Sequence, residues 1–266
     1  MSAGKKLEGK VAVVLGAAGQ DNMGQVIARR FTDEGARVVV AGRKLNELER
    51  FAKTIGGAAF QCDITKKEDV AALFAFAKDW GGHVEIAVNA TGWGLLKGFT
   101  ETTVEEIDQI TDLQFKGPFY FCQAAVDTLG KGGSIIQISS ATATIMLNDH
   151  AAYMGTKAGT DHVIRCVAHE FGERGIRANS ISPGLTETPM TAGAKDVPGL
   201  FDSFLSGYPL GRIGTKDDIA AAAVWLASDE CFMTGQNLQV NGGLTLRRNP
   251  TREEIQAAVV SATGQA

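Results

Sequence analysis

Short runs of apolar residues alternate along the chain with longer segments in which apolar residues recur at helical spacing. The first run, Val11–Leu15, is entirely hydrophobic and ends at Gly16, which is typical of a strand buried on both faces. Over Gln20–Glu34 the apolar residues recur every three or four positions and Gly35 follows, which predicts a helix. The same alternation continues, and we expect strands at 37–41, 58–62, 86–89, 134–139, 176–181 and 238–240, and helices at 45–55, 67–80, 104–128 and 153–172.

Strand–helix units repeat from one end of the chain to the other, with no break in composition between them. This repetition predicts an α/β fold: one doubly wound parallel sheet of the Rossmann type, with helices on both faces. We expect residues 1–243 to form this single domain. The segment from about 185 to 214 is long for a loop, which is typical of a lid over a functional site. Residues 244–266 form a tail with a helix expected at 251–261, which could close a pocket, pack on another subunit or extend freely.

The composition is that of a globular protein and excludes several classes of function. Of 266 residues, 44% are hydrophobic and 21% charged, and the net charge is −4 without a basic cluster, so we expect no nucleic-acid partner. No apolar run approaches the ~20 residues that cross a bilayer, and the polar N-terminal residues do not resemble a secretory signal, so no membrane association is expected. The four cysteines lack paired spacing, which predicts reduced thiols, a cytoplasmic location and no metal site.

The first strand leads into a loop that contains several glycines and runs directly into the first helix. Glycines at a strand-to-helix turn let the backbone approach a pyrophosphate, which the positive N-terminal end of the helix attracts. The spacing differs from the common Gly-x-Gly-x-x-Gly motif, so a purely structural turn remains the alternative. The candidate cofactor-binding residues in this loop are Gly16, Gly19, Asn22, Met23 and Gly24.

The end of the second strand is where a dinucleotide fold distinguishes its two nicotinamide cofactors. An acid at this position binds the ribose 2′-hydroxyl of NAD and repels the 2′-phosphate of NADP. Here the chain has Arg43 and Lys44, and between the end of the strand and Glu47 there is no acidic residue. Because a guanidinium binds phosphate through paired hydrogen bonds, we expect NADP(H) to be favoured. NAD(H) is the alternative if both side chains are simply solvated.

A tyrosine and a lysine four residues apart lie at the start of the helix expected at 153–172. Tyr153 and Lys157 are one turn apart on the same helix face. A free phenol, with a pKa of about 10, is a poor acid at neutral pH, but a neighbouring ammonium favours the phenolate and lowers that pKa. Ser140, at the end of the preceding strand, places a hydroxyl at the same edge of the sheet, where it can polarise a carbonyl. The three residues predict acid–base catalysis at a carbonyl or carbinol group.

These residues together resemble the short-chain dehydrogenase/reductase superfamily, over about residues 8–243. The motifs that carry the resemblance are the glycine loop, Asp63-Ile64, Asn89-Ala-Thr-Gly92, Ser140, Tyr153, Lys157, Pro183-Gly-Leu-Thr-Glu-Thr188 and Asn241-Gly-Gly243. The resemblance implies direct hydride transfer between a nicotinamide cofactor and a carbinol carbon, without a metal. It also implies a homotetramer, or a homodimer, that associates through two long helices.

The resemblance assigns further residues to the cofactor and one to the substrate's proton relay. The expected cofactor contacts are Asp63 and Ile64 at the adenine, Asn89, Ala90 and Gly92 along the cleft, Pro183, Gly184 and Thr186 in the motif after the sixth strand, Thr188 at the nicotinamide carboxamide, and Lys157 at the nicotinamide ribose. Gln114 stands where the family has a catalytic asparagine. Gln114 would keep the backbone carbonyl that binds a relay water, and Pro118 removes a hydrogen-bond donor from the helix nearby.

The substrate pocket is expected after the fourth, fifth and sixth strands. Its candidate lining residues are Trp93, Leu147, His150 and Met190. Because most are apolar, we expect a hydrophobic or aromatic ketone or secondary alcohol as substrate. One alternative is a reductase of 3-oxoacyl groups on acyl carrier protein or CoA. An enoyl reductase, suggested by the long glycine loop, and a nucleotide-binding sensor without catalysis are the others.

Overall fold

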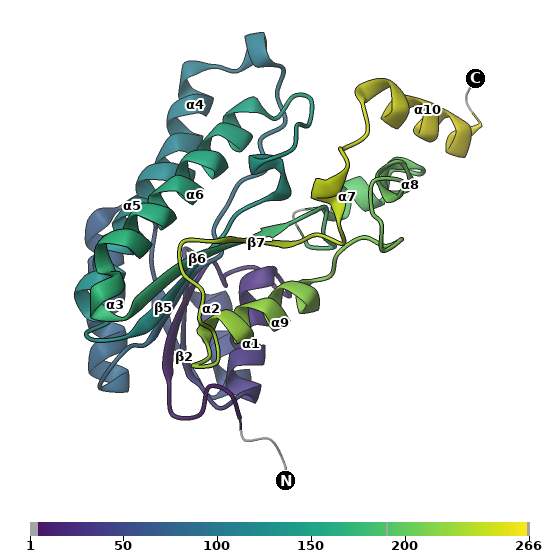
Figure 1. Ribbon diagram of the computed structural model, residues 1–266. Helices are drawn as coiled ribbons and strands as arrows, with labels where there is room; N and C mark the ends of the chain where they lie inside the picture. The colour runs from purple at the N-terminus through teal and green to yellow at the C-terminus, as the bar shows by residue number, and fades with distance from the viewer. Residues whose placement is uncertain (1–4, 190, 265–266) are drawn as a thin grey trace.

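Seven parallel strands form one sheet at the centre of the computed structural model, which describes residues 5–189 and 191–264 (Figure 1). The strands lie in the order β3-β2-β1-β4-β5-β6-β7. Their bounds are β1 (Val11–Leu15), β2 (Arg37–Gly42), β3 (Ala58–Gln61), β4 (Ile86–Asn89), β5 (Gly133–Ile138), β6 (Ile176–Pro183) and β7 (Asn237–Val240). The strand order reverses between β1 and β4, and sheets of this kind bind ligands at the carboxyl ends of the strands beside such a point.

The helices cover both faces of the sheet, which confirms the predicted fold class (Figure 1). Their bounds are α1 (Met23–Asp33), α2 (Leu45–Ile55), α3 (Lys67–Gly81), α4 (Val104–Thr111), α5 (Gly117–Thr128), α6 (Ala151–Phe171), α7 (Ala192–Lys195), α8 (Leu200–Leu205), α9 (Lys216–Ala227) and α10 (Arg252–Thr263). A π-helical segment, η2 (Asp112–Lys116), joins α4 to α5. Single 3-10 turns are η1 (Phe99–Glu101), η3 (Ala141–Ala143), η4 (Gly172–Arg174) and η5 (Leu244–Leu246). Among the described residues, no helix combines the length and apolarity that a membrane crossing needs.

The core consists of two hydrophobic clusters, one on each face of the sheet. Within β1, Ala12 and Val14 belong to one cluster, and Val11, Val13 and Leu15 belong to the other. This division follows from the alternation of side chains along a strand. Helices α1, α2 and α9 supply the first cluster, whereas α3, α5 and α6 supply the second. The sheet is therefore buried on both sides, as its continuous apolar strands predict.

Several elements differ from the sequence-based expectation. Helix α9 lies between β6 and β7, where no helix was expected; Thr215 and Asp218 form a capping box at its start, and that pair was the available signal. The helix expected at 104–128 is interrupted by η2. Helix α1 begins at Met23 because the Asn22 side chain accepts a hydrogen bond from the backbone of Gln25 and so caps it. The long loop contains α7 and α8, and the helix expected in the tail is present as α10.

Candidate active site

A cavity of about 560 Å³ lies at the carboxyl ends of β4, β5 and β6. Its lining includes Tyr153 and Lys157 from α6, Ser140 from the end of β5, and His150 from the turn before α6. Other predicted residues in the lining are Asn22, Met23, Ala90, Gly92, Leu147, Pro183, Gly184, Thr186 and Thr188. The structure thus brings together, around one cavity, residues that the sequence places more than 150 positions apart.

The three predicted catalytic side chains come from two adjacent elements. Lys157 Nζ lies 5.6 Å from the centroid of the Tyr153 ring and donates a hydrogen bond of 2.9 Å to the backbone carbonyl of Ile138. Ser140 begins η3, and its hydroxyl lies 2.8 Å from the Thr142 hydroxyl. The ring of His150 stacks on that of Tyr153 at a centroid distance of 4.3 Å. The phenol and the ammonium therefore share one end of the cavity.

Burial shifts the pKa values of the ionisable side chains in this part of the cavity. Burial raises the pKa of Tyr153, while a hydrogen bond with the Ser140 side chain acts in the opposite direction. Burial also lowers the pKa of Lys157 to about 8, although the nearby carboxylate of Asp161 partly opposes this shift. Desolvation likewise lowers the pKa of His150 and keeps this ring neutral near pH 7. In the protein alone the pKa of Tyr153 thus moves away from neutrality, contrary to the expected effect of Lys157.

Asp161 is an acidic residue beside the site that the sequence reasoning did not find. It follows Lys157 by four residues and Tyr153 by eight on α6, so all three lie along one face of the helix. Asp161 Oδ2 accepts hydrogen bonds from Ser139 Oγ at 2.8 Å and from Asn237 Nδ2 at 2.6 Å. Burial raises the pKa of its carboxyl group. The continued four-residue spacing after Tyr153 and Lys157 was the signal for this residue.

Gln114 lies in η2 and uses both ends of its buried amide. Its Oε1 accepts a hydrogen bond from the Trp93 backbone at 2.9 Å, and its Nε2 donates to Thr156 Oγ1 at 3.0 Å. Its backbone carbonyl accepts from Thr160 Oγ1 at 2.5 Å. Pro118, four residues later, has no N–H to donate to that carbonyl, so the bond from Thr160 takes its place. The carbonyl expected to hold a relay water is therefore already bonded to α6.

The glycine loop packs closely against its surroundings. Gly16 has a φ of 102°, and a Cβ on it would lie 2.6 Å from the Ala90 backbone. A Cβ on Gly24 would lie 2.6 Å from the carbonyl oxygen of Gly16, so both positions require glycine. Asn22 Nδ2 donates to that same carbonyl at 2.7 Å and fixes the loop against α1. The resulting bare backbone at a helix N-terminus is a suitable cradle for a pyrophosphate.

The remaining predicted cofactor residues lie outside the lining of the large cavity. Arg43 and Lys44 are exposed between β2 and α2, and neither forms an ion pair with a carboxylate of the described residues. The Asp63 carboxylate accepts hydrogen bonds from Thr65, and Ile64 is buried. The other predicted residues outside this lining are Gly16, Gly19, Gly24, Asn89 and Gln114. Apart from Gln114, which lies in η2, these positions lie at or just after the ends of β1, β2, β3 and β4, at the same edge of the sheet as the cavity.

Of the four predicted substrate residues, Leu147 and His150 line the cavity. Trp93 is absent from the lining, and Leu96 from the same loop takes part instead. Met190 lies outside the described residues. Among the described residues, no group of three or more His, Cys, Asp and Glu side chains is arranged to hold a metal ion.

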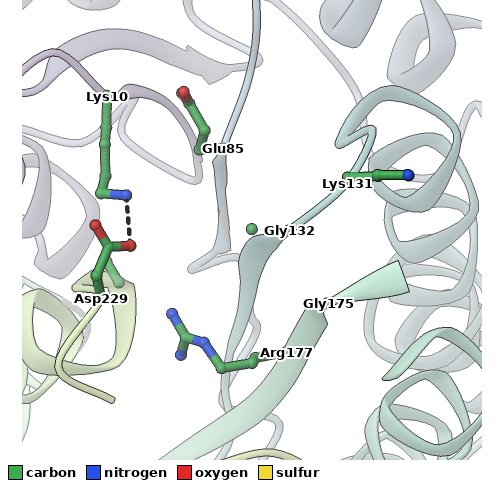
Figure 2. Close-up of a pocket in the computed structure, with 9 residues that line it drawn as sticks. Lys10, Glu85, Lys131, Gly132, Gly175, Arg177 and Asp229 are labelled. Carbon is green, nitrogen blue, oxygen red and sulfur yellow. Dashed lines mark hydrogen bonds and ion pairs between the residues drawn. The ribbon is translucent and has the colours of Figure 1, made fainter. Parts of the chain in front are cut away.

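A second cavity, of about 280 Å³, lies at the opposite edge of the sheet, among the amino ends of the strands (Figure 2). Two of its cationic side chains have partners within the protein: Lys10 Nζ lies 2.8 Å from Asp229 Oδ1, and Arg177 donates to the backbone carbonyls of Leu226 and Ser228. None of the predicted site residues belongs to its lining. The candidate active site is therefore the cavity at the carboxyl edge.

Comparisons with known proteins identify relatives of this chain. A family model described as Enoyl-(Acyl carrier protein) reductase matches residues 16–245. D-threitol dehydrogenase of Mycolicibacterium smegmatis is 35% identical over 251 residues, covering 91% of this chain and 95% of the relative. 3beta-hydroxysteroid dehydrogenase 1 of Eggerthella lenta is 36% identical over 250 residues, covering 90% and 95% respectively.

A solved structure has the same fold as this chain. A short-chain type dehydrogenase/reductase from Mycobacterium ulcerans superposes with a TM-score of 0.89 at 28% identity, covering 96% of this chain and 98% of the other. The family match, the relatives and the fold agree on an oxidoreductase that uses a nicotinamide cofactor and acts on alcohol or carbonyl groups. The chain belongs to the short-chain dehydrogenase/reductase superfamily.

Proposed function

We propose that the protein interconverts ketones and secondary alcohols that carry bulky apolar or aromatic groups, with NADP(H) as the preferred cofactor. One observation carries the proposal: Tyr153, Lys157 and Ser140 meet at one end of a cavity whose other walls are largely apolar. The apolar lining residues are Leu96, Leu147, Leu185, Leu200, Phe204, Leu244 and Ile255. The two relatives described above are named for a polyol and a hydroxysteroid, and an apolar lining favours the second kind of substrate.

The residues divide the chemistry of reduction among them. A nicotinamide cofactor, when bound, would supply the hydride for the carbonyl carbon. Ser140 donates a hydrogen bond to the carbonyl oxygen, and Tyr153 transfers its phenolic proton to that oxygen as negative charge develops there. Lys157 stabilises the phenolate that remains and shares its other donors with the cofactor ribose. Oxidation of an alcohol uses the same residues in reverse, with the Tyr153 phenolate as base.

The cofactor preference depends on the exposed side chains after β2. Arg43 and Lys44 have no carboxylate partner among the described residues, so both are free to bind an anion. A 2′-phosphate at this position would gain charge-assisted hydrogen bonds from the guanidinium. The close-packed glycine loop and the N-terminus of α1 fit the pyrophosphate of either cofactor. We therefore propose NADP(H), and Asp63, Ile64, Asn89 and Thr188 remain the expected contacts for its other groups.

The location and the assembly of the protein are part of the same proposal. All four cysteines are free thiols, and Cys166 is exposed, which suits the reducing cytoplasm. Val104, Ile107 and Phe119 are exposed apolar residues on α4 and α5. Such side chains favour burial against a second copy, in keeping with the expected homotetramer or homodimer.

Replacement of Tyr153 by phenylalanine tests the proposed reaction. We expect Tyr153→Phe to lower kcat by about 10²–10⁴-fold, because it removes the proton donor, and to leave NADPH affinity unchanged. Tyr120→Phe, a partly buried tyrosine outside the cavity, is the matched control. The substrate panel contains aromatic and bicyclic ketones, a short ketose, a 3-oxoacyl thioester and an enoyl thioester, each assayed with NADPH and NADH.

The panel separates the proposal from its alternatives. Fastest reduction of the bulky ketones supports the proposal, whereas preference for the 3-oxoacyl or enoyl thioester would replace it with the corresponding reductase. If the protein binds the nucleotide but turns over none of the compounds in either direction, the result would favour the alternative of a nucleotide-binding sensor without catalysis. Full activity of Tyr153→Phe would overturn the catalytic assignment.

A further inference from the structure

The chain beyond the last strand reaches back to the active-site cavity. After η5, residues 249–256 comprise the turn before α10 and the first residues of that helix. Helix α10 lies beside α8 in Figure 1. Residues of this segment that line the cavity are Asn249, Pro250, Arg252, Ile255 and Gln256. The tail therefore does not extend freely: its first helical turn forms part of the cavity that contains Tyr153.

Two polar contacts hold this segment to the loop before α6. Asn249 Nδ2 donates to the backbone carbonyl of Met146 at 3.0 Å. Arg252 forms an ion pair with both carboxylate oxygens of Asp149. Asp149 adopts a left-handed backbone conformation, with a φ of 60°, and directly precedes His150, whose ring stacks on Tyr153. The tail is thus fixed one residue away from a side chain that contacts the proposed proton donor.

Apolar packing supports the same arrangement. Ile255 joins Leu147, Leu200 and Phe204 in a cluster separate from the two clusters of the sheet. Helices α8 and α10 approach so closely that a Cβ on Gly199 would lie 2.4 Å from the carbonyl oxygen of Ala258. Thr251 and Glu254 form a capping box that fixes where α10 begins. The position of Ile255 in the cavity is therefore determined by both neighbouring elements.

We propose that residues 249–256 form the outer wall of the substrate pocket, and that Ile255, positioned by Arg252, supplies the apolar contact through which the enzyme favours substrates with a large apolar group. The inference rests on the proposed function and specifies its substrate class as neutral ketones with an extended apolar body. A reacting carbonyl is held at the end of the cavity that contains Tyr153 and Ser140. Only the part of a substrate remote from that carbonyl contacts the wall.

The charge of the wall supports a neutral substrate. The carboxylate of Asp149 neutralises Arg252, so the guanidinium is not free to bind an anionic group. Around it the wall offers the amides of Asn249 and Gln256, which suit a hydroxyl or a second carbonyl far from the reacting centre. Arg252 acts as a positioning residue, because it places Ile255 rather than carrying charge to the substrate.

The test compares two variants of the wall with one matched control. Ile255→Ala removes the apolar contact, and Arg252→Met breaks the ion pair with Asp149 at nearly constant side-chain length. Arg248→Met is the control, because Arg248 pairs with Glu254 in the same segment but lies outside the cavity lining. Steady-state kinetics are measured with a small ketone such as cyclohexanone and a bulky one such as 2-decalone, alongside NADPH affinity.

We expect each wall variant to raise KM for the bulky ketone by about tenfold, the effect of losing a few methylene contacts in a pocket. Its kcat, KM for the small ketone and NADPH affinity should change by less than about twofold. The proposed wall would be contradicted by an equal rise in KM for both ketones or by no rise for either. The same rise in KM in Arg248→Met would also contradict it. If Arg252→Met fails to fold, Ile255→Ala decides the question. A wild type that turns over no ketone would instead overturn the proposed function, and the wall with it.

Discussion

Three ionisable side chains spaced four residues apart on α6, those of Tyr153, Lys157 and Asp161, lie at the site of the proposed proton transfer. Burial disfavours charge on each of them, which raises the pKa of Tyr153 and Asp161 and lowers that of Lys157. The Asp161 carboxylate acts on both neighbours, since a negative charge raises the pKa of an ammonium and of a phenol alike. The groups that contact Asp161 from β7 and the end of β5, Asn237 and Ser139, are uncharged. Asp161 is thus the anion in a position to adjust both pKa values.

Replacing Asp161 by asparagine should move the alkaline limit of ketone reduction to lower pH. The change removes the negative charge, so the pKa values of Lys157 and Tyr153 both fall. The proposed reduction uses protonated Tyr153 and charged Lys157, and both forms would then be lost at lower pH. The measurement is the pH profile of kcat. Asp229→Asn, which removes an acid paired with Lys10 at the far edge of the sheet, should leave the profile unchanged. A uniform loss at every pH would indicate a packing role only.

Arg43 provides a test of the cofactor preference at a single residue. Because hydrogen bonds to charged groups contribute about 1.5–3 kcal/mol, Arg43→Ala should weaken NADPH binding tenfold or more and leave NADH binding unchanged. Titration followed by nicotinamide fluorescence measures both affinities. The control is Arg50→Ala, which removes an exposed guanidinium already paired with Glu47 on α2. Tighter binding of NADH than of NADPH by the wild type would assign the protein to NAD(H).

At the scale of elements, the π-helical segment η2 connects the helices that frame the site. Its extra residue brings Gln114 to a position where the side chain bonds the loop after β4 and the backbone carbonyl bonds α6. The Gly117 N–H correspondingly bonds the carbonyl of Asp112, five residues earlier. The segment therefore holds α4, α5, α6 and the loop at Trp93 together in one hydrogen-bonded unit.

Gln114→Leu should destabilise the protein by about 1–3 kcal/mol, because the partly buried Trp93 N–H loses its acceptor. We also expect slower turnover, since the loop at Trp93 borders the cavity through Gly92 and Gly94. Denaturant unfolding and kcat are the two measurements. Gln109→Leu, an exposed glutamine one turn earlier on α4, is the matched control and should change neither. Unchanged stability of Gln114→Leu would mean that the Trp93 N–H finds another acceptor.

At the scale of the whole molecule, the sheet separates two cores that share no helix. Ile27 on α1 and Ile164 on α6 are both fully buried, on opposite faces. Ile27→Val and Ile164→Val should each lower the free energy of unfolding by about 0.5–1.5 kcal/mol. Their effects should add to within about 0.5 kcal/mol in the double variant, as measured by denaturant unfolding. Non-additivity beyond that would show that the sheet transmits strain between its faces. Ile27→Val with Ile219→Val, within one cluster, is the comparison pair.

The sequence predicted those features that depend on neighbours in the chain. Tyr153 and Lys157 lie one helical turn apart, so their spacing alone predicts a shared face. The apolar runs at β1 and β4 matched their strands because both are buried on each side. Helix α9 was missed because its core, Ile219-Ala-Ala-Ala-Ala-Val224, is apolar throughout and has no helical periodicity.

The contacts that the sequence did not reveal join residues far apart in the chain. Asp161 accepts a hydrogen bond from Asn237, which is 76 positions away in the sequence. Arg252 pairs with Asp149, which is 103 positions away. No local pattern specifies such pairs, because they depend on how α6, β7 and the tail pack after folding. The π-segment was also hidden: Pro118 indicated a disturbed helix, but not that Thr160 would bond the carbonyl of Gln114. Loop residues such as Trp93 were assigned by their place after a strand, which does not determine where the side chain points.

The position of the tail also has a consequence for how enzymes with this scaffold diversify. β7 ends at Val240, so the seven strands of the described sheet and the proposed catalytic residues precede the segment that begins at Asn249. Recombination or mutation can therefore exchange this segment while the residues of the proposed hydride-transfer site are kept. Lengthening, shortening or replacing the residues from 249 onward offers a separate route to new substrates, in evolution and in the laboratory, while the sheet and the proposed catalytic residues are inherited unchanged.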